Sequence, residues 1–375
     1  MKNILITGGA GFIGSRLCEK LFDKGYKVTV LDNLSPQIHG NGESDLFKKI
    51  KDKCIFIKGD VRNKEDWKTS IKEQEIIVHL AAETGTGQSM YEVEKYNDVN
   101  IMGTAHMLEL LANTTHSVKK MIVASSRAIY GEGKYICENH GETYPTQRND
   151  SDMNKGEFNP KCNICNKELI LSSTDENSKI HPSSIYGINK QQQEQMVMLI
   201  GEALNIPSVA FRYQNVYGPG QSLSNPYTGI LSIFSTRILN GNDLDIYEDG
   251  LESRDFVFID DVVDATILGI EKEEANSEIF NVGSGVATTV KEVAESLKDY
   301  YSSDINISIS GKYRLGDIRH NYADLTKAKN LLGFSPKFDF TKGISEFVSW
   351  VRTQEIKEDN YDKSVKELKD KGLMK

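Results

Sequence analysis

The sequence predicts an α/β protein built on a doubly wound parallel sheet, with a smaller C-terminal lobe and an inserted segment that carries cysteine and histidine. Three observations predict this class. A short apolar run leads into closely spaced glycines, strand-like and helix-like segments alternate through the first half of the chain, and the alternation changes after Gly220. Strands that alternate with helices form a parallel sheet with helices on both faces.

The first strand is expected at residues 3–7, a mostly apolar run suited to a buried parallel strand. It leads into Gly8, Gly11 and Gly14, after which a helical pattern continues to Lys24. Glycines at this spacing permit a tight turn and let a pyrophosphate approach the backbone at the N-terminus of the helix.

A second strand, residues 27–31, ends at Asp32. A carboxylate there can accept hydrogen bonds from ribose hydroxyls and repels a 2′-phosphate. The order of strand, glycines, helix, strand and acid therefore predicts a dinucleotide-binding (Rossmann) unit that prefers NAD to NADP. Glycines that serve only a turn would leave Asp32 unexplained.

Further strands are expected at residues 54–57, 76–80 and 121–124, with a helix at residues 99–111. Ligands of such sheets lie at the carboxyl ends of the strands. Three residues fall at these ends, namely Asp60, Ala81 and Ser126.

A tyrosine and a lysine four residues apart, Tyr186 and Lys190, share one face of the helix expected at residues 185–204. A free phenol has a pKa of about 10, and a neighbouring cation is expected to lower it, so Tyr186 becomes a candidate base. The Ser126 hydroxyl can hold the reacting oxygen in line. Spacing alone is weak evidence, because Tyr91 and Lys95 repeat it before the fifth strand, where surface chemistry is the better interpretation.

Composition limits the other classes of function. The 375 residues are 38% hydrophobic and 26% charged, which is typical of one large or two smaller globular domains. No apolar run approaches the roughly 20 residues of a membrane span, and the start does not resemble a signal peptide, so a cytoplasmic enzyme without a membrane partner is expected. The net charge of −9 argues against a nucleic-acid partner.

Ordered motifs extend from residue 1 to about 355, with one interruption. They are Gly8, Gly11 and Gly14; Asp32-Asn33; Asp60-Val61; Leu80-Ala81-Ala82; Asn100; Ser125-Ser126 with Tyr130-Gly131; Tyr186 with Lys190; Arg212 to Gly220; Ser253-Arg254-Asp255; Arg314 to Asp317; Tyr322-Ala323-Asp324; and Leu332-Gly333-Phe334. These motifs resemble the extended short-chain dehydrogenase/reductase family, specifically its nucleotide-sugar epimerases and dehydratases.

The resemblance implies roles for single residues. Ser126, Tyr186 and Lys190 match the catalytic positions, with Tyr186 as acid/base. The residues implied in NAD binding are Gly8, Gly11, Phe12, Ile13, Gly14, Asp32, Asn33, Asp60, Val61, Leu80, Ala81, Ala82, Asn100, Ser125, Tyr186, Lys190 and Tyr213. The residues expected at a nucleoside-diphosphate sugar are Asn215, Arg254 and Arg314 at the diphosphate, Ser126 at the reacting oxygen, and Thr86 and Gln88, which either contact the hexose or are solvated in a loop.

The residues after Ser126 indicate which reaction of the family is carried out. Dehydratases of the family resemble one another in an Asp-Glu pair there, whereas this chain has Arg127 and Ala128, which cannot expel water. The resemblance then implies epimerisation at C4 of the sugar through a 4-keto intermediate. A 4-ketoreductase or dehydrogenase, and a non-catalytic NAD-sensing interaction protein, stay as alternatives.

An insertion is expected at residues 132–181, because the 60 positions between Ser126 and Tyr186 exceed the spacing usual in the family. It contains Cys137-x-x-His140 and Cys162-x-x-Cys165. Both spacings suit a tetrahedral structural zinc ion, which could order this polar segment. Free thiols, or an ancestral site that no longer binds metal, are the alternatives. This pattern also resembles the branch of the family that contains the dTDP-L-rhamnose 4-epimerases.

The expected domains follow from these assignments. Residues 1–215 and 256–283 form the NAD-binding domain, residues 216–255 and 284–355 form a nucleotide-sugar-binding lobe, and residues 356–375 form a charged tail, expected as a solvated helix. The helices at 99–111 and 185–204 resemble those that pair relatives into dimers, so a homodimer is expected, although their apolar residues would equally suit the core.

Overall fold

The computed structural model describes residues 2–40, 44–225, 227 and 229–375. Its largest element is a seven-stranded sheet in which neighbouring strands are parallel, in the order β13-β9-β5-β4-β1-β2-β3. The strands are β1 (Asn3–Thr7), β2 (Lys27–Asp32), β3 (Ile55–Lys58), β4 (Ile76–His79), β5 (Lys120–Ser126), β9 (Ser208–Tyr213) and β13 (Ile279–Val282).

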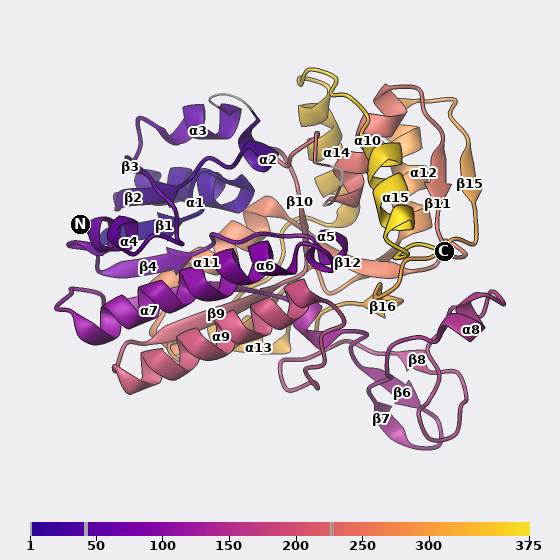
Figure 1. Ribbon diagram of the computed structural model, residues 1–375, viewed down its shortest axis with the longest axis horizontal. Coiled ribbons are helices and arrows are strands. Elements are labelled where there is room, and N and C mark those ends of the chain that lie inside the picture. The colour runs from indigo at the N-terminus through magenta and orange to yellow at the C-terminus, as the bar shows by residue number, and fades with distance from the viewer. Residues whose placement is uncertain (1, 41–43, 226, 228) are drawn as a thin grey trace.

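Helices cover both faces of this sheet (Figure 1). One face carries α1 (Phe12–Asp23), α3 (Asp45–Ile50) and α11 (Ile259–Glu271), and the other carries α4 (Lys64–Ile71), α7 (Gly103–Asn113) and α9 (Ile185–Ala203). Successive strand residues face opposite sides, so Ile4 and Ile6 pack into one hydrophobic core and Leu5 into the other. This arrangement confirms the predicted doubly wound α/β class.

The predicted strands of the first half agree with the structure to within one or two residues at each end. The helix predicted at residues 99–111 is longer: α6 (Val93–Tyr96), a π-helical turn (Asn97–Met102) and α7 follow one another without a break. The strand order reverses between β1 and β4, and ligands of such sheets bind beside this point.

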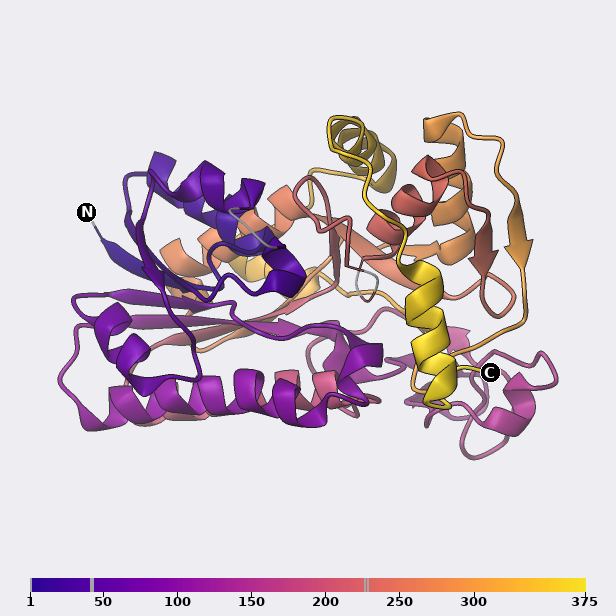
Figure 2. The ribbon, with the colours of Figure 1, turned by 45° about the horizontal axis from the view of Figure 1, so that its top comes forward.

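A second group of elements forms a smaller lobe beside the carboxyl edge of the sheet (Figure 2). Its strands are β10 (Asn215–Tyr217), β12 (Ser253–Phe258), β14 (Ala287–Thr289) and β16 (His320–Asn321) in one sheet and β11 (Leu244–Ile246) and β15 (Ile307–Ile309) in another. Its helices are α10 (Ile230–Leu239), α12 (Val290–Tyr301), α14 (Phe340–Val351) and α15 (Tyr361–Asp370).

Short elements complete the chain. The inserted segment forms the three-stranded antiparallel sheet of β6 (Tyr135–Cys137), β7 (Gly141–Thr143) and β8 (Ile170–Leu171), with α8 (Asp150–Met153). The remaining helical pieces are α2 (Pro36–His39), α5 (Thr86–Ser89), α13 (Thr326–Leu332) and the 3-10 turns Arg127–Tyr130 and Glu273–Ala275. Among the described residues, no helix combines the length and apolar character needed to cross a bilayer.

Candidate active site

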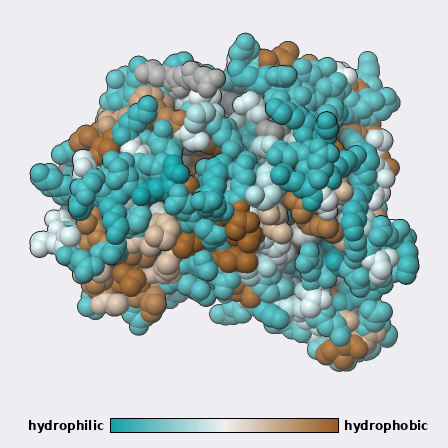
Figure 3. Space-filling view, viewed as in Figure 1, coloured by the Kyte–Doolittle hydropathy of each residue, from teal (hydrophilic) through white to brown (hydrophobic). Residues whose placement is uncertain are grey.

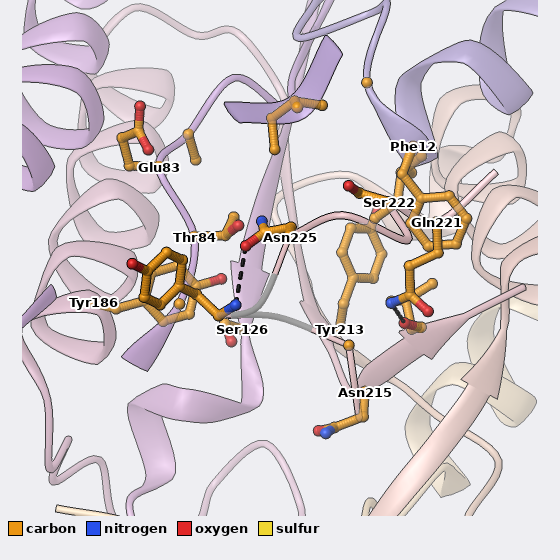
Figure 4. A pocket seen from close by; sticks show the side chains of 18 of the residues that line it. Phe12, Glu83, Thr84, Ser126, Tyr186, Tyr213, Asn215, Gln221, Ser222 and Asn225 are labelled. Carbon is orange, nitrogen blue, oxygen red and sulfur yellow. Dashed lines mark hydrogen bonds between the residues drawn. The ribbon is translucent and has the colours of Figure 1, made fainter. Parts of the chain in front are cut away.

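A cavity of about 580 Å³ lies where the carboxyl edge of the large sheet faces the smaller lobe. Figure 4 shows Tyr186, Ser126 and Thr84 on one side of it and Phe12, Gln221 and Ser222 on the other. The cavity is lined by most of the residues predicted from the sequence: Gly8, Gly11, Phe12, Ile13, Gly14, Asp32, Asn33, Val61, Leu80, Ala81, Ala82, Thr86, Ser125, Ser126, Tyr186, Lys190, Tyr213, Asn215, Arg254 and Arg314.

The glycine loop after β1 has no room for side chains. Gly8 has φ +67°, and a Cβ there would lie 2.8 Å from the backbone nitrogen of Ala81. A Cβ on Gly14 would lie 2.3 Å from the Gly8 carbonyl oxygen. The helix α1 that follows has Gly11 at its N-cap, which leaves its first N–H groups without a side-chain acceptor. A pyrophosphate of NAD fits this bare, positively polarised helix end.

Asp32 is held at the end of β2 with its carboxylate beside the cavity. One oxygen accepts from the backbone N–H of Ala10 at 3.0 Å and the other from that of Leu34 at 2.9 Å. The remaining lone pairs can accept from ribose hydroxyls, and the negative charge disfavours a 2′-phosphate. The residues present therefore fit the adenosine end of NAD.

Three predicted binding residues do not line the cavity, and each instead contacts a residue near it. Asp60 forms an ion pair with Arg62 (Nη2–Oδ2 2.8 Å) and accepts from Asn33 Nδ2 at 3.0 Å. The contact of Asp60 with the cofactor stays a prediction: its carboxylate lies outside the lining of the cavity, whereas Asn33, which donates to it, lies in the lining.

Gln88 and Asn100 also lie outside the lining of the cavity, so their contacts with the ligands stay predictions. Gln88 is buried and accepts from Gln37 Nε2 at 3.0 Å, while Asn100 accepts from the backbone N–H of Glu83 at 2.8 Å. Gln37 and Glu83 line the cavity. Gln88 and Asn100 thus support cavity-lining neighbours, which sequence spacing could not distinguish from direct contact. The Tyr213 hydroxyl, although its ring lines the cavity, contacts Thr266 Oγ1 at 2.7 Å.

The N-terminus of α9 positions Tyr186. Ser184 caps the helix by accepting from the Gly187 N–H at 3.1 Å, and the Ser89 hydroxyl accepts from the Tyr186 N–H at 3.1 Å. Figure 4 shows Tyr186 and Ser126 on the same side of the cavity, and the Ser126 hydroxyl acts on the phenol as a hydrogen-bond partner. Burial raises the pKa of Tyr186, while the hydrogen bond to Ser126 and the charge of Arg127 act in the opposite direction.

Lys190 lies on the same face of α9 but contacts a different group. Its ammonium donates to the Ala124 carbonyl at 3.0 Å and lies 6.0 Å from the centre of the Tyr186 ring. Burial lowers the pKa of Lys190 to about 7. The prediction that Lys190 lowers the phenol pKa is wrong, because desolvation dominates at Tyr186 and the cation acting on it is Arg127.

Positive charge gathers at the other end of the cavity. Arg254 and Arg314 place Nη2 atoms 2.9 Å and 2.8 Å from the two carboxylate oxygens of Asp317. Burial alone would raise the pKa of Asp317, but the charges of Arg314 and Arg254 hold it well below its usual range. Two guanidinium groups facing a cavity form a suitable site for a diphosphate.

Arg127 lines the cavity, although the sequence analysis used it only to exclude the elimination of water. Its Nε donates to Asn215 Oδ1 at 3.1 Å, so it fixes a predicted diphosphate contact. Burial, followed by repulsion from Arg254, lowers the pKa of Arg127 to about 10. Its position directly after Ser126 was the one sequence signal that could have identified it.

The C-terminal tail also reaches the cavity. Tyr361, at the start of α15, lines it together with Tyr247, whose hydroxyl contacts that of Tyr361. Arg314 lies over the Tyr247 ring, with Cζ 5.6 Å from the ring centre. Figure 2 shows α15 crossing in front of the smaller lobe. The tail was expected as a solvated helix; it is helical, but it packs against the site.

The cysteine and histidine side chains predicted as metal ligands meet in the inserted segment. Cys137, His140, Cys162 and Cys165 place their ligand atoms within 4.8 Å of one another. Four such groups in one cluster have the composition of a structural zinc site.

The sequence and structure were compared with known proteins. Residues 4–152 and 165–283 match the model of the NAD dependent epimerase/dehydratase family. The chain is 36% identical to a dTDP-L-rhamnose 4-epimerase of Burkholderia thailandensis, over 96% of this chain and 97% of the relative. It is 31% identical to a protein of Methanocaldococcus jannaschii described as a UDP-glucose 4-epimerase, over 93% of this chain and 98% of the relative.

Solved structures give the same result. A UDP-glucose 4-epimerase of Thermotoga maritima, solved with UDP-glucose, superposes with a TM-score of 0.75 at 32% identity and covers 93% of this chain and 98% of its own. A UDP-N-acetylglucosamine 4-epimerase of Methanobrevibacter ruminantium, in complex with UDP-N-acetylmuramic acid, gives 0.76 at 30% identity, with 94% and 99% covered. The chain therefore belongs to the NAD dependent epimerase/dehydratase family of extended short-chain dehydrogenases/reductases, as its motifs predicted.

Proposed function

We propose that the chain is an NAD-dependent epimerase that inverts C4 of a nucleoside-diphosphate hexose. The observation that carries the proposal is the presence in one cavity of the Tyr186–Ser126 pair and, at the far end, of the two arginines on Asp317. A proton-transferring group and an anion clamp at opposite ends of a cavity suit a substrate that is held by its diphosphate and reacts at its sugar.

The two parts of the chain then have distinct tasks. Residues 1–215 and 256–283 hold NAD through the glycine loop and Asp32. Residues 216–255 and 284–355 hold the nucleotide sugar chiefly through Arg254 and Arg314, which line the cavity together with Asn215. When bound, NAD supplies a hydride acceptor that later returns the hydride.

The protein residues move the proton. The Ser126 hydroxyl orients the C4 oxygen of the sugar, and the Tyr186 phenolate takes its proton as the C4–H bond breaks. After the 4-keto sugar has rotated within the cavity, Tyr186 returns the proton to the same oxygen, and the opposite configuration results. The positive charge of Arg127 and the hydrogen bond to Ser126 favour the phenolate.

Elimination of water does not fit the residues beside Ser126. Arg127 donates to Asn215 and Ala128 donates its N–H to Ser126 Oγ at 3.1 Å. Neither residue provides a carboxylate that could remove a proton next to the keto group. These contacts favour epimerisation over dehydration.

The substrate that we favour is dTDP-L-rhamnose, with dTDP-6-deoxy-L-talose as its C4 epimer. The 36% identity to the relative described as a dTDP-L-rhamnose 4-epimerase supports this choice, and the cysteine and histidine pattern of the sequence resembles that branch.

The test is to incubate the purified protein with dTDP-L-rhamnose, and separately with UDP-glucose, without added NAD, and to follow C4 inversion by NMR. We expect many turnovers per chain and a kcat/KM at least about tenfold higher for dTDP-L-rhamnose, equivalent to about 1.4 kcal/mol. A 4-ketoreductase would instead need one reduced cofactor per product. Absence of turnover with both sugars would refute the epimerase assignment for these substrates.

We also propose that two copies pair through α7 and α9. Figure 3 shows hydrophobic side chains gathered over the part of this face where Figure 1 places these helices. Leu199 of α9 is 66% exposed, and Met102, at the end of the π-helical turn that leads into α7, is 46% exposed. Exposed apolar side chains that gather on adjacent elements mark an interaction surface. Light scattering should give twice the mass of 42.0 kDa for the wild type and a monomer for Leu199→Lys. A monomeric wild type would contradict the pairing.

A further inference from the structure

The inserted segment contains two turns of the same construction. Cys137 is the last residue of β6, and His140 lies in the turn that leads from it to β7. Cys162 and Cys165 lie in a second turn, closed by the antiparallel bridge between Lys161 and Glu168. The two turns bring their ligand atoms to one point.

The backbone of the two turns has features in common, although the hydrogen bond to the first ligand's carbonyl comes from the third residue after it in one turn and the fourth in the other. The His140 N–H donates to the Cys137 carbonyl at 3.3 Å, and the Asn166 N–H donates to the Cys162 carbonyl at 2.9 Å. The residue after each second ligand has a left-handed conformation, with φ +71° at Gly141 and +58° at Asn166. Backbone N–H groups inside each turn point at the first sulfur. Paired turns of this kind can surround one ion with fixed ligands.

The distances between ligand atoms fit tetrahedral zinc. Cys137 Sγ lies 3.4 Å from His140 Nδ1 and 3.6 Å from Cys165 Sγ, and Cys162 Sγ lies 3.6 Å from His140 Nδ1. Zn–S bonds of about 2.3 Å and Zn–N bonds of about 2.0–2.1 Å give tetrahedron edges of about 3.8 Å and about 3.5 Å. A disulfide would need about 2.05 Å between sulfurs. Three sulfurs and one nitrogen leave no open position, so the site is structural.

We propose that these four side chains bind one Zn²⁺. We further propose that the inserted segment, ordered by this ion, holds the loop carrying Arg314 and Asp317 in place. The first part is independent of the enzyme's activity. The second part rests on the proposed function, because it takes this loop as the diphosphate site.

The first link runs from the metal turn to the chain segment beside it. Asn163 lies between Cys162 and Cys165. Its Nδ2 donates to the Tyr144 carbonyl at 3.0 Å, and its Oδ1 accepts from the Thr146 N–H at 3.2 Å. The turn that binds the ion therefore also fixes residues 144–146 by their backbone.

The second link runs from this segment to the diphosphate loop through Arg148, two residues further on. Its guanidinium is buried and contacts groups from three parts of the chain. Nε lies 3.2 Å from Glu132 Oε1, Nη2 lies 2.8 Å from Glu248 Oε1, and Nη2 donates to the Asp317 carbonyl at 2.9 Å. Asp317 is the carboxylate that holds Arg254 and Arg314.

A third contact is apolar. Met153 and Phe158 of the insertion pack with Tyr313 and Leu315, the two residues that flank Arg314. The Tyr313 hydroxyl also donates to Asp150 Oδ1 at 2.7 Å. The insertion thus supports the backbone on both sides of Arg314. Because the insertion buries few apolar residues of its own, its order depends on the metal.

The metal assignment is tested on the full chain by elemental analysis and thermal unfolding. We expect about one zinc per chain in the wild type and in Cys54→Ser, whose sulfur lies outside the cluster, and less than about 0.2 in Cys165→Ser. Chelation should lower the Tm of the wild type and leave that of Cys165→Ser unchanged. Wild-type protein that holds no zinc, takes up none when it is added and keeps its Tm with chelator would overturn the assignment.

The link to the diphosphate loop is tested with Asn163→Ala, which keeps all four ligands. We expect full zinc content, unchanged NAD affinity and about tenfold weaker binding of dTDP by calorimetry, the loss typical of removing the hydrogen bonds behind a binding group. Unchanged dTDP affinity in this variant would overturn the link. If the wild type binds neither dTDP nor UDP, the proposed function fails, together with the link, while the zinc content still decides the metal site.

Discussion

Lys190 and Tyr186 share one face of α9, yet the ammonium of Lys190 donates to the Ala124 carbonyl at 3.0 Å and stays 6.0 Å from the centre of the tyrosine ring. The lysine is 3% exposed. A buried amine without a carboxylate partner loses its proton easily, which is why its pKa falls to about 7. The charge state of this residue therefore changes near neutral pH.

The stability of the ligand-free protein should increase with pH because of Lys190. Between the folded pKa of about 7 and the unfolded value of about 10.4, the unfolded chain binds more protons, so the free energy of unfolding rises with pH. Relative to Lys190→Met, the wild type should gain about 2 kcal/mol between pH 7 and pH 9. Urea unfolding of both proteins at several pH values measures this gain.

Lys95 provides the control, since Tyr91 and Lys95 have the same spacing. Burial opposes protonation there, but contacts with Glu92 and Glu83 raise the pKa of Lys95. Relative to Lys95→Met, the wild type should therefore gain no free energy of unfolding between pH 7 and pH 9. If the free energy of unfolding depended on pH in the same way in the wild type and in Lys190→Met, the assignment of a lowered pKa to Lys190 would be contradicted.

Asp32 should determine which dinucleotide binds. Asp32→Ser removes the charge and the carboxylate lone pairs at the ribose, so NAD affinity should fall about 10- to 100-fold and the discrimination against NADP should shrink. Calorimetry with both dinucleotides measures these changes. Asp45→Asn, at an exposed position of α3, should bind as the wild type does. Equal discrimination in Asp32→Ser and wild type would exclude this role.

Arg314 should act on the nucleotide sugar and not on NAD. Arg314→Ala removes one of the two guanidinium groups on Asp317, and the KM for the sugar nucleotide should rise about 10- to 100-fold because a charged hydrogen bond of about 1.5–3 kcal/mol is lost. NAD affinity should not change. Steady-state kinetics and calorimetry separate the two effects. If only the affinity for NAD were weakened, Arg314 would contact NAD and not the nucleotide sugar.

The C-terminal tail should contribute to the same end of the cavity. Removing residues 356–375 deletes Tyr361 and the antiparallel β-bridge that pairs the backbones of Arg314 and Met374. We expect weaker dTDP binding with unchanged NAD affinity, measured by calorimetry on the truncated chain. The single variant Tyr361→Ala should show the same change to a smaller extent. If both variants bind dTDP as tightly as the full chain, the tail only covers the protein surface.

Local patterns predicted the large sheet well. Apolar strand runs, the glycine loop and the acid at Asp32 are set by contacts close in sequence, so β1, α1 and β2 were placed nearly to the residue. The same holds for the cap and first turn of α9, where Ser184 and Tyr186 are neighbours. The residues that the glycine loop and this turn bring to the cavity are among those named from the sequence, while their roles in binding and catalysis stay predictions.

Features that depend on distant contacts were predicted less well. Gln88 and Asn100 turn toward Gln37 and Glu83 because buried amides bond to the nearest backbone or side-chain partner, and no spacing encodes that choice. Tyr361 reaches the cavity only because α15 folds back against the smaller lobe, where the Tyr361 hydroxyl contacts that of Tyr247, 114 positions earlier in the chain. The pKa of Tyr186 depends on burial, which the Tyr-x-x-x-Lys spacing does not report.

The central claim is that the Tyr186 hydroxyl transfers the proton at C4 of the sugar. Turnover of dTDP-L-rhamnose by Tyr186→Phe, measured by NMR together with NAD affinity, tests it most directly. Tyr91→Phe is the matched control and should turn over normally. The account predicts that Tyr186→Phe binds NAD as the wild type does but loses at least about a hundredfold in kcat, the lower range for an acid–base group. A kcat within about twofold of the wild type in Tyr186→Phe would contradict it.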